Sequence, residues 1–272
     1  MDTRPIGVFD SGLGGLTAVR ELSELLPQEK IVYFGDTGRV PYGNKSRETI
    51  IEYARQDENF LLKQGVKMII AACGTVSSVA GCLQKKLPVP YIEVVTPSAE
   101  CAVNITKNKK IGVIGTAATI NSHSYAKKIK ELDNECEVFS KSCPLLVPLV
   151  EAGWIDRNDF VTVETVKRYI LPVLENGVDT LIMGCTHYPI LKDVINDVCE
   201  GKVRLISPGE QAALRAKTYL QNNGMLNDEK PFKKFFVSDS VELFVDIASM
   251  FLGVNVTEEV TRIDITGFGG QF

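Results

Sequence analysis

The chain carries two similar stretches, Met68-Ile69-Ile70-Ala71-Ala72-Cys73-Gly74-Thr75 and Thr180-Leu181-Ile182-Met183-Gly184-Cys185-Thr186-His187, and these decide its fold. In each, an apolar run of strand length ends in a small residue, followed by a cysteine and a threonine within two positions. Open α/β folds place reactive groups at the carboxyl end of buried strands. The pair therefore predicts two thiols, one from each half of the chain, that face each other across a cleft. Such thiols suit a reaction that needs one base on either face of the same carbon.

Around these stretches, apolar runs of strand length alternate with helical patterns. We expect strands at 6–9, 31–34, 68–72, 90–94 and 235–237, and helices at 16–26, 46–64, 210–222 and 241–251. This alternation is typical of parallel βαβ units, which collect ligands at the carboxyl ends of their strands. The fold class is therefore α/β, with two open lobes of mainly parallel sheet and an active-site cleft between them.

The second half of the chain repeats the pattern of the first. Ile111-Gly112-Val113-Ile114-Gly115-Thr116 resembles Ile6-Gly7-Val8-Phe9-Asp10-Ser11, and Cys185 follows Cys73 at a nearly equal offset. Either the α/β unit is duplicated, or parallel strands simply resemble one another. We expect one domain from residues 1–96 plus 209–272, on the Cys73 side, and a second from residues 97–208, on the Cys185 side.

Composition excludes several classes of function. A net charge of −4 and a pI near 5.4 argue against a general nucleic-acid binder, which needs a clustered basic surface. We expect no membrane partner either, because no apolar run reaches the roughly 20 residues that span a bilayer. Seven cysteines, without a recognisable secretory signal at the start, indicate reduced thiols in the cytoplasm. No CxxC pair is present, so we expect no metal site.

The segment Asp10-Ser11-Gly12-Leu13-Gly14-Gly15 follows the first expected strand and opens a helix. Its backbone N–H groups suit an anion, but the glycine spacing is wrong for a GxGxxG nucleotide fingerprint. A carboxylate at the strand tip also repels phosphate. Asp10 is expected to hold a substrate ammonium or to accept a proton from a nearby thiol, the alternative being a helix cap.

Small residues and hydroxyls surround Cys73, and a helix is expected to start beside it. A helix N-terminus stabilises a thiolate, so we expect the pKa of Cys73 to be lowered. The other five cysteines, Cys82, Cys101, Cys136, Cys143 and Cys199, are interpreted as core residues.

Cys185-Thr186-His187-Tyr188-Pro189 carries one of only two histidines in the chain. His187 is expected to turn toward the cleft and polarise the thiol or relay its proton. Glu151 interrupts an apolar run, either as a carboxylate in the cleft or as the first solvated residue at a helix end. The turn Pro41-Tyr42-Gly43-Asn44 lies on a loop long enough to cover a small polar ligand.

Taken together, these segments resemble the glutamate racemases, and the resemblance runs nearly end to end. It rests on the residues from Gly7 to Gly15, Asp36-Thr37 with Val40-Pro41-Tyr42-Gly43, Ala72-Cys73 with Thr75, the residues from Val147 to Gly153, and Gly184-Cys185-Thr186-His187-Tyr188-Pro189.

The resemblance implies racemisation of glutamate by two thiols without a cofactor, in an enzyme that supplies D-glutamate for peptidoglycan and forms a homodimer. Cys73 and Cys185 would be the catalytic thiols, with Asp10 assisting the first and His187 and Glu151 the second. The positions implied to bind substrate, largely through hydroxyls and backbone N–H groups, are Asp10, Ser11, Pro41, Tyr42, Gly43, Gly74, Thr75, Thr186 and His187.

Gly74 departs from the family pattern, which usually has Asn after the first cysteine to contact substrate. Loss of a hydrogen bond to a charged group matters by roughly 1.5–3 kcal/mol if nothing replaces it. The alternatives are therefore a racemase of the same fold that acts on aspartate or another small amino acid, and a relative that binds or regulates without turnover.

Overall fold

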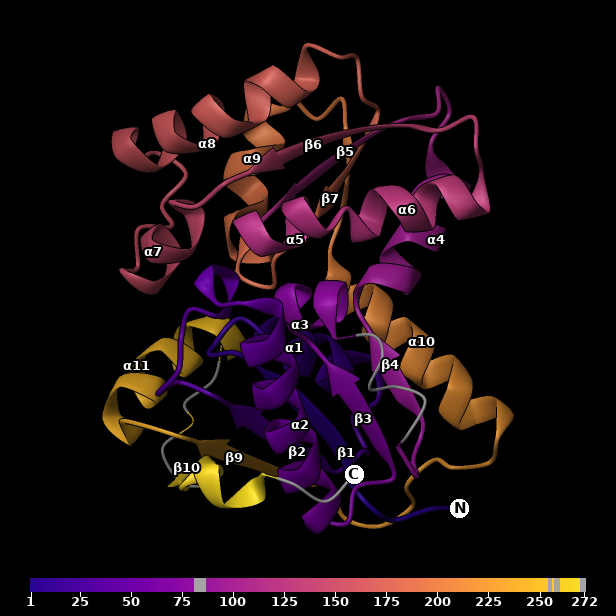
Figure 1. Ribbon diagram of the computed structural model, residues 1–272, viewed down its shortest axis with the longest axis vertical. Helices are drawn as coiled ribbons and strands as arrows, with labels where there is room; N and C mark the ends of the chain where they lie inside the picture. The colour runs from indigo at the N-terminus through magenta and orange to yellow at the C-terminus, as the bar shows by residue number, and fades with distance from the viewer. Residues whose placement is uncertain (81–86, 254–255, 257–259, 270–272) are drawn as a thin grey trace.

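The protein folds into two α/β domains, each built on a parallel sheet (Figure 1). The computed structural model describes residues 1–80, 87–253, 256 and 260–269. The predicted α/β class with two parallel sheets is confirmed. Cys82, interpreted from the sequence as a core residue, lies outside the described residues.

The first sheet has six strands in the order β10-β9-β2-β1-β3-β4. Its strands are β1 (Ile6–Asp10), β2 (Ile31–Gly35), β3 (Met68–Ala71), β4 (Tyr91–Glu93), β9 (Lys233–Val237) and β10 (Val260–Arg262). Alternate side chains of these strands face opposite helical layers, as the two-residue period of a strand requires. Ile6 and Val8 pack against α1 (Leu16–Leu25), whereas Phe9 packs on the side of α2 (Arg47–Lys63).

The second sheet has four strands in the order β6-β5-β7-β8. They are β5 (Lys110–Gly115), β6 (Glu137–Ser142), β7 (Thr180–Met183) and β8 (Arg204–Ile206). All the strands of the first sheet fall within residues 1–96 and 209–272, and all those of the second within 97–208. This is the division that we propose for the two domains.

Helices cover both sheets and join them. The remaining helical segments are α3 (Gly74–Val79), α4 (Val95–Ile105), α5 (Ala117–Ser122), α6 (Ser124–Leu132), α7 (Leu146–Glu151), α8 (Phe160–Leu174), α9 (Lys192–Val198), α10 (Pro208–Asn222) and α11 (Val241–Leu252), with short 3-10 turns η1 (Tyr42–Asn44), η3 (Tyr188–Leu191) and η4 (Ile265–Phe268). The chain enters the second domain through α4 and leaves it through α10, which pack against each other (Figure 1). One apolar cluster runs from α1 and α10 into α8 and α9, so the two domains share a core.

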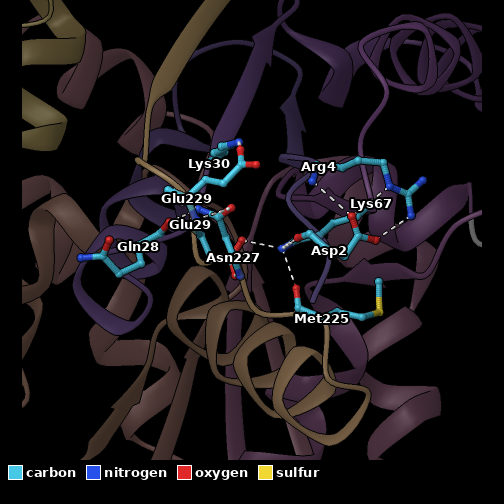
Figure 2. A network of polar contacts seen from close by, with 9 residues as sticks. All are labelled: Asp2, Arg4, Gln28, Glu29, Lys30, Lys67, Met225, Asn227 and Glu229. Carbon is cyan, nitrogen blue, oxygen red and sulfur yellow. Dashed lines mark hydrogen bonds and ion pairs between the residues drawn. The ribbon is translucent and has the colours of Figure 1, made fainter.

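A buried ion pair closes the end of the first sheet that lies away from the second domain. Lys67 is fully buried, and its Nζ lies 2.7 Å from Glu29 Oε2. It also donates to the carbonyls of Asp2, at 2.8 Å, and Met225, at 2.7 Å (Figure 2). Two donors of the ammonium are therefore used by backbone carbonyls, and its charge is paired with the Glu29 carboxylate. The contacts tie the start of the chain to the segment that returns from the second domain.

Candidate active site

A cavity of about 350 Å³ lies where the carboxyl ends of the two sheets meet. Residues that follow β1, β2 and β3 line it from the first domain, and residues that follow β5, β6 and β7 line it from the second. All of the residues selected from the sequence reach this cavity: Asp10, Ser11, Pro41, Tyr42, Gly43, Cys73, Gly74, Thr75, Glu151, Cys185, Thr186 and His187. Parallel βαβ topology produces this meeting, because every strand in each sheet ends on the same edge.

On the first-domain side, Cys73 and Ser11 are in contact, and Asp10 lies beside them. The Cys73 thiol donates to Ser11 Oγ at 3.3 Å. Asp10 is almost fully buried, and its carboxylate accepts from the Gly12 N–H at 3.0 Å. Burial raises its pKa, against the opposing charge of His187 and nearby N–H groups. Asp10 does not cap α1, whose N-cap is Gly15.

The expectation of a lowered pKa at Cys73 is wrong. Burial, and then the negative charge of Asp10, raise the pKa of this thiol to about 12. Cys73 is the N-cap of α3, as expected, but that helix has only six residues. Hydrogen bonds from Val76 and Ser11 act in the expected direction, and loss of solvent outweighs them. Cys73 is therefore a protonated thiol at neutral pH.

On the second-domain side, Cys185, His187 and Glu151 form a connected row. Cys185 Sγ lies 3.9 Å from His187 Nδ1, and His187 Nε2 lies 3.0 Å from Glu151 Oε1. Burial lowers the pKa of His187, but the contacts with Cys185 and Glu151 outweigh it and raise that pKa to about 10. His187 is therefore an imidazolium at neutral pH.

Hydroxyls join the two sides of the cavity. Thr75 Oγ1 and Thr116 Oγ1 lie 3.1 Å apart, although they belong to different domains. The Thr186 hydroxyl donates to Asp10 Oδ1 at 3.4 Å, again between domains. Thr17 also donates to the Thr186 carbonyl, at 3.0 Å. These contacts hold the two domains close around the cavity.

Gly74 lies where the two backbones come closest. A Cβ at this position would stand 2.4 Å from the carbonyl oxygen of Gly184, at the end of β7. Atoms at that distance overlap, and the obstacle is backbone rather than a movable side chain. Glycine is therefore the residue that fits where the two backbones come this close. It lacks the side-chain amide of the asparagine that is usual in the family.

Cys143 and Thr116 are among the lining residues that were not selected from the sequence as site residues. Cys143 was interpreted as a core residue, and it is buried, but it also lines the cavity wall. Burial raises its pKa to about 12, and its thiol donates to the Lys141 carbonyl at 3.5 Å. Thr116 was missed as well, although it occupies the place of Ser11 in the repeated segment. That repetition is the signal that could have identified it.

The cavity contains several acid–base groups. Among the residues that the structure describes, no group of three or more His, Cys, Asp or Glu side chains is arranged to hold a metal ion. In the same part of the chain, no helix is long and apolar enough to cross a membrane. A protonated thiol on one wall and a thiol paired with imidazolium on the other can remove one proton and donate another.

Comparisons with known proteins identify relatives over nearly the whole chain. The family model for Asp/Glu/hydantoin racemases matches residues 18–216. The glutamate racemase of Syntrophus aciditrophicus is 48% identical over 255 residues, which is 93% of this chain and 94% of that protein. The glutamate racemase of Neisseria meningitidis serogroup A is 45% identical over 266 residues, covering 96% of this chain and 97% of that one.

Solved structures agree with these relatives. The glutamate racemase of Francisella tularensis, in complex with D-glutamate, superposes with a TM-score of 0.91 at 38% identity, covering 98% of this chain and 100% of that chain. The Thermus thermophilus glutamate racemase, in complex with β-chloro-D-alanine, gives a TM-score of 0.88 at 39% identity, covering 98% and 99%. An aspartate racemase from Picrophilus torridus gives 0.56 at 18% identity and shares the fold.

Proposed function

The chain belongs to the Asp/Glu/hydantoin racemase family, and from this membership we propose that it interconverts L- and D-glutamate without a cofactor. The observation that carries the proposal is the pair of thiols, Cys73 after β3 and Cys185 after β7, on the walls of one cavity. The relatives at 42–48% identity that cover most of this chain are glutamate racemases. Glutamate is therefore the substrate.

The two thiols act as base and acid on opposite faces of the substrate. In one direction Cys185, in its thiolate form, takes the Cα proton of bound glutamate and becomes a thiol. Cys73 gives its thiol proton to the opposite face of Cα and becomes a thiolate. One C–H bond breaks and one forms, so the product has the inverted configuration and no oxidant or reductant is needed. The opposite enantiomer uses the same steps in reverse, as microscopic reversibility requires.

Residues around the thiols have supporting roles in this proposal. Glu151 orients His187 through its contact with Nε2, and Asp10 assists Cys73. The hydroxyls of Ser11, Thr75 and Thr186 and the backbone of 41–44 and Gly74 surround the substrate carboxylates. Donors aimed at the α-carboxylate stabilise the charge that develops when Cα loses its proton.

The cellular setting is also part of the proposal. The six described cysteines are all free, which fits a reducing compartment, and we place the enzyme in the cytoplasm. There it supplies D-glutamate for peptidoglycan synthesis. We further propose a homodimer. Trp154, between α7 and α8, and Phe160, the first residue of α8, are exposed aromatic side chains of the kind that is enriched at protein interfaces.

The test is solvent exchange at Cα. Purified protein is incubated in D2O with L-glutamate or, separately, L-aspartate, and deuterium at Cα and optical activity are followed by NMR and polarimetry. We expect deuterium incorporation and loss of optical activity with glutamate. Absence of both would overturn the proposal, and exchange with aspartate alone would assign the protein to aspartate instead.

Single thiol variants test the two-base mechanism. Cys73→Ala and Cys185→Ala are each expected to lower the racemisation rate by roughly a thousandfold or more, because each removes a proton-transfer group. Cys101→Ala, which changes a half-buried thiol on α4 outside the cavity, is the matched control and should keep full activity. Full racemisation by either of the first two variants would exclude the mechanism.

A further inference from the structure

Tyr42 lines the cavity, but its hydroxyl contacts two carboxyl groups of the protein. Tyr42 lies in the loop after β2 that also brings Pro41, Gly43 and Asn44 to the cavity. Its side chain is buried, and its hydroxyl contacts Asp36 Oδ2 and lies 3.0 Å from Asp57 Oδ2. The phenol oxygen is thus occupied by two carboxyl groups of the protein. The hydroxyl of Tyr42 is therefore engaged within the protein.

The number of hydrogens available determines which of these three groups donates a hydrogen bond to which. A phenol has one hydrogen, so it can donate to only one of two carboxyl groups. The other carboxyl group must carry a proton and donate it to the phenol oxygen. Asp57, on α2, is that group because it is completely buried. Its burial, followed by the charge of Asp36, raises its pKa well above the usual range. Tyr42 then donates to Asp36 and accepts from Asp57.

Arg39 completes the cluster. Its guanidinium contacts Asp36, donates to Asp57 Oδ1 at 3.1 Å and also contacts Gln56. It lies over the ring of Tyr53, with 3.9 Å from Cζ to the ring centroid, in the range of a cation–π contact. The guanidinium thus contacts both carboxyl groups that contact the Tyr42 hydroxyl. Buried polar groups that are hydrogen-bonded to one another in this way hold each other rigidly.

The same cluster is fixed to the sheet on its other side. The Ser238 hydroxyl, just after β9, donates to Asp36 Oδ1 at 2.7 Å. The Gly38 N–H donates to Ser238 Oγ at 2.8 Å. At its far end the loop reaches the second domain, where a Cβ on Gly43 would stand 3.3 Å from Thr116 Cβ. The loop therefore spans from a rigid anchor to the cavity and the opposite domain.

We propose that Asp36, Arg39 and Asp57 are positioning residues, which hold the Tyr42 hydroxyl and thereby fix the backbone of residues 41–44 against the substrate. The identity of that substrate rests on the proposed function; the positioning itself does not. A fixed loop binds substrate without a loss of loop entropy at each binding event. Release of the loop should therefore raise KM for glutamate more than it lowers kcat.

Three variants test this assignment. Tyr42→Phe removes the hydroxyl and keeps the ring, and Asp57→Ala removes the acid; each is expected to raise KM roughly tenfold, the usual scale for the removal of one hydrogen bond, with little change in kcat. Asp57→Asn keeps a donor toward Tyr42, so it should behave almost as the unchanged protein. Hydrogen exchange of the backbone amides of 37–44, followed by mass spectrometry without substrate, should be faster in Tyr42→Phe and Asp57→Ala only.

The matched control is Lys67→Met, which disturbs a buried polar cluster at the other end of the same sheet. It should lower the melting temperature without changing KM or exchange in 37–44. An unchanged KM in Tyr42→Phe, or equal damage in Asp57→Asn and Asp57→Ala, would overturn the assignment. If the unchanged protein does not racemise glutamate, the proposed function fails, and amide exchange alone decides: unchanged exchange in Tyr42→Phe then refutes the positioning role.

Discussion

Gly74 shows how one missing side chain shapes the active site. Its Cα faces the Gly184 carbonyl so closely that a Cβ would overlap the oxygen. We expect Gly74→Ala to force the two domains apart, and such overpacking typically costs about 1–3 kcal/mol of stability. KM for glutamate should rise as the cavity widens. Steady-state kinetics and urea unfolding measure both effects.

The control for this variant is Gly267→Ala in η4. A Cβ there would meet no atom within 4 Å, so neither KM nor stability should change beyond the small effect of any glycine replacement. If Gly74→Ala matched Gly267→Ala in both measurements, the close contact between the domains would not exist in solution.

At the residue scale, the sequence predicted where the reactive cysteines lie, but not the surroundings of their side chains in the fold. Cys73 and Cys185 could be found from the sequence because each follows an apolar run, and both runs form buried strands in the structure. The pKa of Cys73 could not be predicted, because it depends on burial and on Asp10, which is distant in sequence. Cys143 is the core residue that the sequence indicated, but nothing in its neighbours in the sequence shows that a cavity also lies beside it.

Helix α2 contains a titratable group whose effect on stability can be measured. Glu58 is buried, and burial raises its pKa to about 8, although Tyr91 and Arg55 oppose the shift. The folded protein therefore keeps a proton that the unfolded chain loses near pH 4.5. Stability should fall as the pH rises from about 4.5 through about 8, with a slope near 1.4 kcal/mol per pH unit.

Glu58→Gln removes this titration while keeping the shape of the side chain. We expect the variant and the unchanged protein to be similarly stable at pH 5, and the variant to be more stable by about 3–4 kcal/mol at pH 8. Urea unfolding at the two pH values gives the difference. A constant difference between them would mean that Glu58 is already ionised in the folded protein.

At the scale of elements, apolar strands were predicted, including the edge strand β4 at 90–94, whereas polar edge strands were not. The runs at 6–9, 31–34 and 68–72 lie inside the first sheet, where both faces are covered and the sequence is continuously apolar. Strands β6 and β10 end their sheets, and β6 reads Glu137-Val138-Phe139-Ser140-Lys141-Ser142, which is mostly polar. An edge strand needs less apolar surface, so its pattern resembles that of a loop.

For the whole molecule, the order of the strands within the sheets could not be predicted from the sequence. The apolar runs do not reveal that β9, near residue 235, pairs with β2, near residue 33. That pairing depends on where α10 returns the chain, and this is decided by packing between α1 and α10. Repetition of the strand–cysteine pattern still indicated two sheets with one cleft, because each half carries its own set of strand ends.

The return of the chain depends on the buried ion pair of Lys67 and Glu29 (Figure 2). Lys67 also holds the carbonyls of Asp2 and Met225, and Glu29 accepts from the Asn227 N–H at 2.8 Å. Four segments that are distant in sequence therefore meet at this pair. Lys67→Met should lower the free energy of unfolding by about 3–5 kcal/mol, because it leaves the Glu29 carboxylate buried without its partner.

The double variant Lys67→Met/Glu29→Met separates the cost of the lone charge from the loss of the pair. Removal of both charges should recover a large part of the stability, since an apolar replacement of a buried pair is often nearly neutral. The carbonyls of Asp2 and Met225 lose a donor in both variants, so recovery should be incomplete. Urea unfolding measures all three proteins. A loss below about 1 kcal/mol in Lys67→Met, as for an exposed pair, would mean that water reaches this cluster and that apolar packing alone holds the returning segment.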